Sequence, residues 1–302
     1  MTEEVENVDG AIDSANLKLI EDSPKEVAAA AAAGKLKIGI IGDNYLADAT
    51  RASFDTKVTD VNHVTDGESM SELIQWKPNV VFICTDIPLL KNDALDDAQF
   101  INNVLMVANH TVAGVCVKTT INNETIERLV SAVGLEWYAN KLVYSPEVHE
   151  TAEEVLNGRY ILLGGSPSAL EAHQEILRNN AYLSMKEIFT GSLETIAYAK
   201  LGLAGFKAVK QTFFNQFHNA ILDMGGANPT HVRRIIESHP EFTNSLMSIP
   251  TFIRSTVSSE VSIKQSKSYG GEYANSDVKM LTSMTDRLTL LDECINLRNL
   301  KD

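Results

Sequence analysis

The sequence lacks the features that mark membrane, secreted and nucleic-acid-binding proteins. No apolar run approaches the ~18–20 residues that a transmembrane helix needs. The first four residues, Met1-Thr2-Glu3-Glu4, are acidic where a signal peptide would be basic. Basic side chains are scarce, because 26 Lys and Arg face 40 Asp and Glu. The net charge of −14 argues against nucleic acid or an anionic membrane as a partner and favours a cytoplasmic protein.

Cysteine is also scarce. The three cysteines, Cys84, Cys116 and Cys294, are far apart and none belongs to a C-x-x-C pair. We therefore expect neither a disulfide framework nor a zinc site, and the seven histidines suggest no other metal site. Cys84 and Cys116 lie inside apolar runs, which predicts that they are small residues of a hydrophobic core.

Composition divides the chain into three parts. Residues 1–34 are rich in acidic residues and alanine, which predicts a flexible leader, with an assembly arm as the alternative. Residues 35–190 alternate short apolar runs with helical stretches, the pattern of a doubly wound α/β domain with a Rossmann-like parallel sheet. Residues 191–302 predict a helical domain that begins with a long, proline-free helix over 193–225. The predicted strands are 35–42, 58–61, 79–85, 111–119, 142–144, 160–164 and 187–189.

The turn after the first predicted strand is a degenerate dinucleotide-binding motif. The G-x-G-x-x-G motif lets the backbone approach a pyrophosphate at a helix N-terminus, and here only Gly42 of its glycines is present. Asn44 is expected to adopt positive φ, and Ala47 is small enough for helix–strand packing. Asp60 follows Gly42 by eighteen residues, at the end of the second predicted strand, where an acid would bind a ribose. Asp43 would repel a pyrophosphate, so a domain that no longer binds a nucleotide is the alternative.

Several polar side chains follow the predicted strands at their carboxyl ends, where open α/β sheets bind ligands. Thr85 and Thr120 are candidate cofactor contacts at two of these ends. Glu147, after the strand over 142–144, is a candidate general base if burial raises its pKa. The alternative for Glu147 is an acid that faces the dipole of a following helix.

Two further candidates lie in the helical part. Lys200 lies within the long apolar helix, where a lysine is costly unless it reaches a partner or a cleft. It is a candidate to stabilise an alkoxide or to act as a general acid, and a surface lysine is the alternative. Asp277 follows a loop with Gly270 and Gly271 that can approach a ligand closely, and the alternative is that Asp277 caps a helix that starts there.

In their order and spacing these motifs resemble the nucleotide-sugar dehydrogenases, the family that includes UDP-glucose 6-dehydrogenase and GDP-mannose dehydrogenase. The resemblance runs from about residue 35 to residue 299. Six segments carry it, and the family's own motif follows each in parentheses. In the sheet part they are Gly42 with Tyr45 (G-x-G-Y-V-G), 117–120 (K-S-T) and 144–147 ([SN]-P-E-F). In the helical part they are 199–201 with Asn215 (K-L-x-x-N, then I-N-E), 226–229 with Val232 and Ile236 (G-A-D-x-x-x-V-x-x-x-I), and Tyr269-Gly270-Gly271 with Asp277 (G-[FY]-G-G-S-C-x-P-K-D).

The resemblance implies NAD as cofactor and two successive hydride transfers from an alcohol to give an acid. It implies Glu147 as the general base of the hydrolytic step, Lys200 as the group that stabilises oxyanions, and Asp277 as the residue that orients the water. It also implies a cofactor contact at Tyr45 and a substrate loop at 269–271. A small alcohol or a nucleotide sugar is the expected substrate, and a homodimer built on the long helix is expected.

The chain departs from this family at the residues that carry its chemistry. Tyr273 stands at the position of the nucleophilic cysteine, and Ala204 replaces the helix asparagine. The sequence also ends soon after the helix that leads to the family's second α/β domain. Because a thioester needs a thiol, we expect at most a two-electron alcohol/carbonyl oxidoreductase. The alternatives are a catalytically dead binding or assembly protein and a nucleotide-binding module without turnover.

Overall fold

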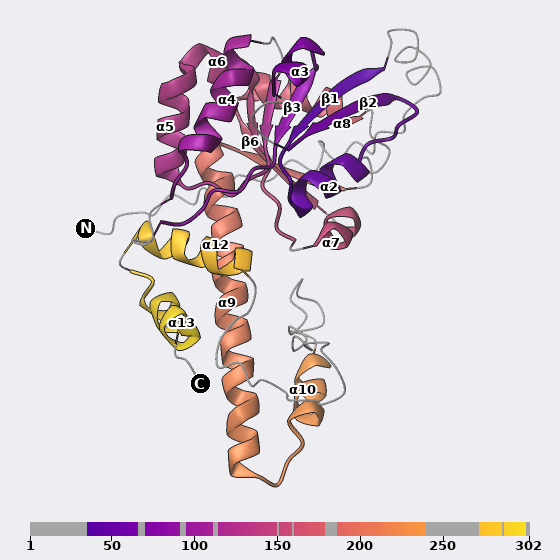
Figure 1. Cartoon of the computed structure of the whole chain (residues 1–302). Helices are drawn as coiled ribbons and strands as arrows, with labels where there is room; N and C mark the ends of the chain where they lie inside the picture. Colours follow the sequence, from indigo (N-terminus) through magenta and orange to yellow (C-terminus); the bar gives the residue numbers. More distant parts are fainter. Residues whose placement is uncertain are drawn as a thin grey trace, which may run out of the picture.

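The computed structural model describes residues 35–65, 70–90, 95–110, 114–149, 151–158, 160–178, 186–239, 272–285 and 287–299. They form one sheet with helices on both faces, and a long helix extends from the sheet with further helices beside it (Figure 1). The predicted leader and the predicted substrate loop at 269–271 lie outside the described residues.

The sheet has seven strands in the order β2-β1-β3-β4-β5-β6-β7. The first five are parallel, β6 is antiparallel to β5, and β7 is parallel to β6. The strands are β1 (Leu36–Ile41), β2 (Thr59–Val64), β3 (Val80–Ile83), β4 (Gly114–Val117), β5 (Leu142–Tyr144), β6 (Tyr160–Gly165) and β7 (Glu187–Gly191).

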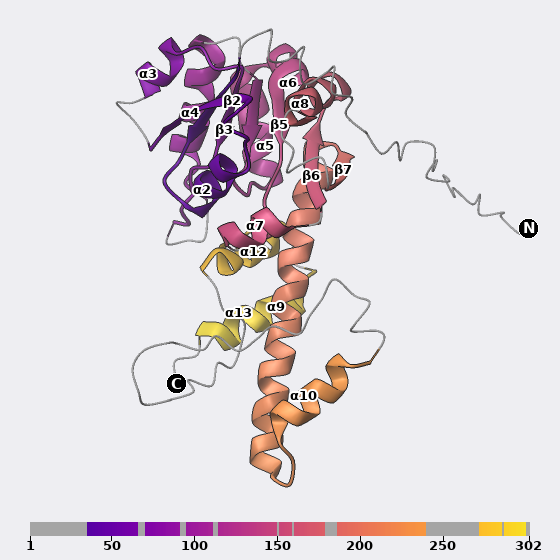
Figure 2. The ribbon, with the colours of Figure 1, turned by 90° about the vertical axis from the view of Figure 1, so that its right-hand side faces the viewer.

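Helices cover both faces of this sheet, because alternate side chains of each buried strand point to opposite sides. Val80 and Phe82 of β3 pack in the cluster that includes residues of α2 and α8. Figure 2 shows how the helices surround the sheet. Val81 and Ile83 pack in the cluster built with α3, α4, α5 and the start of α9. The helices are α2 (Tyr45–Ala52), α3 (Met70–Gln75), α4 (Ala98–His110), α5 (Asn123–Val133), α6 (Leu135–Lys141), α7 (Ala152–Asn157), α8 (Pro167–Arg178), α9 (Leu193–Met224), α10 (Pro229–Glu237), α12 (Glu272–Ser283) and α13 (Thr289–Asn299). The predicted doubly wound α/β fold is confirmed.

The reversed direction of β6 was not predicted from its apolar run. A parallel connection needs a crossover that returns along a face of the sheet. The segment between β5 and β6 instead contains the six-residue helix α7, which lies beyond the carboxyl edge of the sheet and contacts α2 (Figure 1). The chain therefore re-enters the sheet from that edge, and β6 runs antiparallel to β5.

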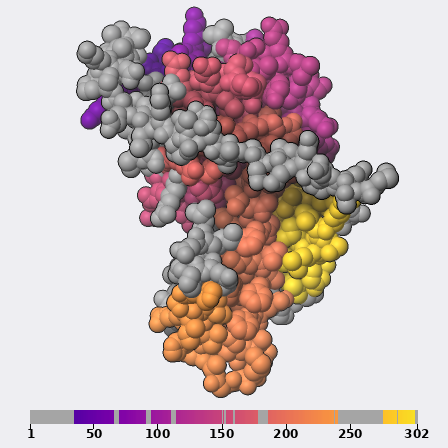
Figure 3. Space-filling view, turned by 180° about the vertical axis from the view of Figure 1, so that it is seen from behind, coloured from indigo at the N-terminus to yellow at the C-terminus, as the bar shows by residue number. Residues whose placement is uncertain are grey.

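Helix α9 joins the sheet to the helical part and confirms the helix predicted over 193–225. Ser192 caps its N-terminus and Gly225, at φ +71°, ends it after 32 residues, roughly 48 Å. Leu193 and Ile196 pack in the core under the sheet, and further along α9 Ala208 packs with residues of α12 and α13. Seen from behind, these C-terminal helices lie against the middle of α9 and α10 lies near its far end (Figure 3). No helix in the described part of the chain is long and apolar enough to cross a membrane.

The strand order reverses between β1 and β3, whose carboxyl ends lie side by side. Open α/β sheets bind ligands at this point, because the connections on its two sides leave toward opposite faces and a crevice remains between them. Gly42 follows β1 there, and Cys84 with Thr85 follows β3. The predicted dinucleotide turn therefore lies at the switch point of the sheet.

Candidate functional site

Gly42 allows the turn after β1 to pass directly against the end of β3. Its φ is +142°, and a Cβ atom there would lie 2.8 Å from both the carbonyl carbon and the oxygen of Cys84. The Gly42 N–H donates to Val64 O at 3.0 Å. The remaining glycine of the degenerate motif is thus required by the approach of two backbone segments.

Asn44 has a different role from the one expected for it. Its φ is −110°, so the expectation of positive φ is wrong. Its Oδ1 atom caps α2 by accepting hydrogen bonds from Leu46 N at 3.0 Å and Ala47 N at 3.2 Å. Its Nδ2 atom donates to Cys84 O at 2.5 Å and to Asp86 Oδ1 at 2.8 Å. A side chain that caps a helix needs extended backbone at its own position, which explains the difference.

Asp60 does not lie at the end of a strand, so its predicted placement is wrong. The register of β2 pairs Asp60 with Lys37 near the start of β1, whereas Val64 pairs with Ile41 at the other end. Asp60 is therefore at the edge opposite Gly42, where its carboxylate lies 3.4 Å from Lys35 Nζ. Asn62 and His63 interrupt the apolar run, but pairing with β1 continues the strand past them. A ribose-binding acid would have to follow Val64 instead.

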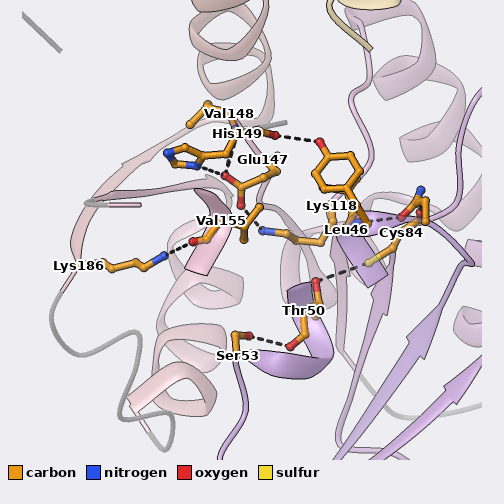
Figure 4. Close-up of polar contacts among 12 residues, drawn as sticks. Leu46, Thr50, Ser53, Cys84, Lys118, Glu147, Val148, His149, Val155 and Lys186 are labelled. Atoms are coloured by element: carbon orange, nitrogen blue, oxygen red, sulfur yellow. Dashed lines mark hydrogen bonds and ion pairs between the residues drawn. The ribbon is translucent and has the colours of Figure 1, made fainter. Parts of the chain in front are cut away.

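Lys118, Glu147 and His149 form a partly buried cluster after the ends of β4 and β5 (Figure 4). Glu147 Oε2 lies 3.6 Å from Lys118 Nζ, and Glu147 Oε1 lies 2.6 Å from His149 Nδ1. Two other elements hold this segment: Tyr45 on α2 donates its hydroxyl to His149 O at 2.9 Å, and Lys207 on α9 donates to Val148 O at 2.7 Å. The cluster thus ties the sheet to both helices.

The surroundings of Glu147 disfavour the predicted role as a general base. Burial raises its pKa, but the Lys118 ammonium and the hydrogen bonds from His149 and from the Val148 N–H outweigh burial and lower the pKa to about 2. A carboxylate with so low a pKa is a weak proton acceptor near neutral pH. The alternative, an acid at the N-terminus of the following helix, is wrong, because Thr151 caps α7 and the acids of its first turn are Glu153 and Glu154.

We expect Glu147 to make the free energy of unfolding fall at low pH. Its pKa of about 2 in the folded state lies below the ordinary glutamate value of 4.5, so its contribution to stability is complete above about pH 5 and is lost as the pH falls toward 2. The difference in unfolding free energy between the wild type and Glu147→Gln should shrink by roughly 3 kcal/mol from pH 7 to pH 2.5 in urea titrations. The matched variant Glu136→Gln, at an exposed position, should show no such change. If the difference in unfolding free energy from the wild type changed equally with pH in both variants, the lowered pKa of Glu147 in this cluster would be contradicted.

Lys118 belongs to the 117–120 motif that carries the family resemblance, but neither Lys118 nor His149 was assigned a role from the sequence. Two signals were present: Lys118 directly follows a buried apolar strand, and His149 lies two residues after Glu147. Asp86 was also missed, although it directly follows the third predicted strand, 79–85.

Lys200 and Asp277 form a buried ion pair between α9 and α12. Lys200 Nζ lies 2.7 Å from Asp277 Oδ2, and the two side chains are only 10% and 8% exposed. Lys200 is therefore not a surface lysine. The N-cap alternative for Asp277 is wrong, because α12 begins at Glu272. Helix α9, which carries Lys200, contacts β5 and β6 of the sheet, and α12, which carries Asp277, packs against α9. Burial and, to a smaller extent, the charge of Asp277 raise the pKa of the Tyr144 hydroxyl at the end of β5.

None of the three cysteines is placed to replace the missing nucleophile. Cys84 and Cys116 are fully buried in the sheet, as predicted, and burial raises the pKa of each thiol to about 12. Cys294 is buried on α13, where it packs with Ala208 and Leu291. Tyr273 lies in the first turn of α12. A thiolate that could form a thioester is therefore missing from the site.

Thr85 and Thr120 both follow strands at the carboxyl edge, as predicted. Thr85 is 6% exposed and its backbone oxygen accepts a hydrogen bond from Thr119 Oγ1 at 2.6 Å. Its own Oγ1 atom is buried and has no hydrogen-bond partner among the described residues. A buried hydroxyl without a partner is costly, so a ligand that bonded to Thr85 would relieve that cost.

These residues fit a dinucleotide on one condition. The switch point, the close turn at Gly42 and the unpaired hydroxyl of Thr85 suit a bound nucleotide. The amides of Leu46 and Ala47, which would bind a phosphate, already donate to Asn44 Oδ1. A phosphate could therefore bind these amides only after the Asn44 side chain has left them.

No protein-family model and no curated protein matches the chain. Among solved structures, the UDP-D-ManNAc dehydrogenase of Pyrococcus horikoshii is similar with a TM-score of 0.65 and 16% identity, over 87% of this chain and 68% of that chain. A UDP-glucose dehydrogenase of Pyrobaculum islandicum gives a TM-score of 0.67 and 14% identity over the same shares. The 3-hydroxyisobutyrate dehydrogenase of Mycobacterium tuberculosis, with L-serine, gives 0.61 and 12% over 87% of this chain and 92% of that chain.

The chain therefore has a nucleotide-sugar dehydrogenase-like fold, in which a mostly parallel Rossmann-like sheet is followed by a helical part. The resemblance inferred from the order of the motifs is confirmed at the level of the fold. The same fold is shared with a hydroxyacid dehydrogenase whose chain this one covers almost completely.

Proposed function

We propose that this chain is a two-electron oxidoreductase that interconverts a small alcohol and its carbonyl compound with NAD. The buried Lys200–Asp277 pair carries the proposal. A cation held near the carboxyl edge of the sheet can stabilise the oxygen of the substrate as its charge becomes more negative. The bound dinucleotide would supply the hydride acceptor. Lys200 would bind the substrate oxygen and give it a proton when the carbonyl compound is reduced, or take that proton when the alcohol is oxidised, and Asp277 would hold the lysine in place.

The proposed chemistry stops at the carbonyl compound. Oxidation onward to an acid through a thioester needs a thiol, and the cysteine position of the family holds Tyr273. The coverage of 92% of a hydroxyacid dehydrogenase supports a small hydroxy compound ahead of a nucleotide sugar as substrate. We propose Gly42, Tyr45, Thr85 and Thr120 as the cofactor-facing residues of a cytoplasmic enzyme.

Titration of the purified chain with NADH, followed by calorimetry, tests the proposal. Saturable binding with a micromolar Kd is the expected result, and a screen of small hydroxy acids and nucleotide sugars would follow. Absence of binding at millimolar NADH would contradict the proposal.

A binding or assembly protein without turnover is the second candidate. Two observations favour this candidate. The two α2 amides that would bind a phosphate already donate to Asn44, and the hydrogen bond from Asn44 to Asp86 Oδ1 brings a carboxylate close to those amides. Binding of nucleotide sugars without binding of NADH, in the same calorimetric titrations, would support this candidate.

We further propose a homodimer built on α9. Phe206, Phe213 and Met224 recur at helical spacing on one side of α9 and are 47%, 56% and 74% exposed. An exposed apolar stripe of this kind is typical of an association surface. Sedimentation velocity should find a dimer for the wild type and a monomer for Phe213→Glu, and an unchanged dimer in that variant would exclude this surface.

A further inference from the structure

The N-terminal end of α2 is occupied by a side chain of the same turn. The amides of Leu46 and Ala47 point toward the switch point, where a helix N-terminus can bind a phosphate. Asn44 Oδ1 accepts hydrogen bonds from both, at 3.0 and 3.2 Å. An amide oxygen therefore stands where a phosphate oxygen would bind.

Two further contacts fix this side chain in place. Asn44 Nδ2 donates to Cys84 O at 2.5 Å and to Asp86 Oδ1 at 2.8 Å, both directly after β3. Four hydrogen bonds thus hold the amide group across the gap between β1 and β3. The Asp86 carboxylate also adds a negative charge near the point where a phosphate would arrive.

The residues around the occupied amides are those of a binding site. Thr85, between Cys84 and Asp86, is 6% exposed and its hydroxyl lacks a hydrogen-bond partner within the described residues. Gly42 brings the turn within direct contact of the same segment. The unpaired hydroxyl indicates a ligand independently of the helix terminus.

We propose that the Asn44 side chain is an internal plug of the phosphate-binding end of α2, anchored by Cys84 and Asp86. This inference rests on the proposed function. A dinucleotide binds after the side chain rotates away from the amides of Leu46 and Ala47. Its affinity is reduced because four hydrogen bonds must first be broken and the phosphate must then lie near Asp86. The plug sets the cofactor affinity without touching the Lys200–Asp277 pair.

The variant Asn44→Gly tests the plug, because glycine removes the side chain yet is well tolerated as a helix cap. In calorimetric titrations with NADH and with ADP, Asn44→Gly should bind both about tenfold tighter than the wild type, or more. Asp86→Asn, which keeps an acceptor for Asn44 Nδ2 but removes the charge, should give a smaller gain. The melting temperature of Asn44→Gly should fall by a few degrees, because the unliganded variant lacks the same four hydrogen bonds.

Asn228→Gly is the matched control. Asn228 caps α10 with the same pattern, by accepting from Thr230 N at 2.9 Å and His231 N at 3.2 Å. Its replacement should leave the affinity for NADH and ADP unchanged. If the wild type binds NADH and Asn44→Gly binds it equally or more weakly, the plug is wrong and the proposed function stands. If neither protein binds, both proposals are overturned.

Discussion

Replacing Lys200 by methionine should abolish turnover and lower the free energy of unfolding by about 3–5 kcal/mol. The lysine is 10% exposed and lies 2.7 Å from Asp277, so its removal leaves a buried carboxylate without its counter-ion. A buried charge that has lost its counter-ion destabilises a protein far more than the loss of an exposed ion pair, which typically costs about 0–1 kcal/mol. Urea unfolding measures the stability, and oxidation of the substrate found in the screen measures the turnover.

A double variant separates the structural role of the pair from the catalytic one. Lys200→Met/Asp277→Leu replaces both charges by apolar groups and should recover most of the lost stability. It should remain inactive, because no cation remains to bind the substrate oxygen. Lys207→Met, on the same helix, loses a hydrogen bond to Val148 O and should cost only about 1 kcal/mol. Turnover by a stably folded double variant would exclude Lys200 as a catalytic group.

Gly42→Ala should lower the free energy of unfolding by about 2–6 kcal/mol, for two reasons. A φ of +142° is rarely adopted by a residue with a Cβ atom, which costs about 1–3 kcal/mol. The added carbon would also lie 2.8 Å from backbone atoms of Cys84, which cannot move without disturbing β3, and overpacking adds about 1–3 kcal/mol. Because the same shift would disturb the switch point, we expect NADH binding to weaken as well.

Two other glycines serve as controls for this prediction. Gly134 has φ +82° but no neighbour within 4 Å of a Cβ, so Gly134→Ala should show only the backbone cost, about 1–3 kcal/mol. Gly202 is an exposed helical residue with no such neighbour, and Gly202→Ala should stabilise the chain by about 0.5–1 kcal/mol. A Gly42→Ala variant no less stable than Gly134→Ala would contradict the close approach of the turn to β3.

Local patterns were sufficient for the elements of the fold. Near-continuous apolar runs predicted the parallel strands, because a strand buried on both faces leaves no place for polar side chains. The proline-free apolar periodicity predicted α9 nearly to its ends, since Ser192 and Gly225 mark them. The order of weak motifs identified the fold at an identity of only 14–16% to the solved nucleotide-sugar dehydrogenases.

Register and strand direction were beyond local patterns. Asp60 has the expected spacing from Gly42, but pairing between β1 and β2 extends the second strand past it and moves it to the opposite edge. The direction of β6 depends on the edge of the sheet at which the connection from β5 ends. The apolar residues of β6 do not determine that edge. The hydrophobic pattern of a strand determines which of its faces are buried. The neighbouring strands and connections determine where the strand begins and ends and in which direction it runs.

The sequence by itself determined the alternation of strands and helices, the core cysteines, the position of the glycine turn after β1 and the absence of a cysteine close to Asp277 in the chain. Each follows from the identity or spacing of nearby residues. Only the tertiary structure decided the chemistry of the site: Lys118 lowers the pKa of Glu147, Asp277 pairs with Lys200, and Asp86 anchors Asn44. Charge and hydrogen-bonding partners act over a few ångströms, and folding brings them together from distant parts of the chain.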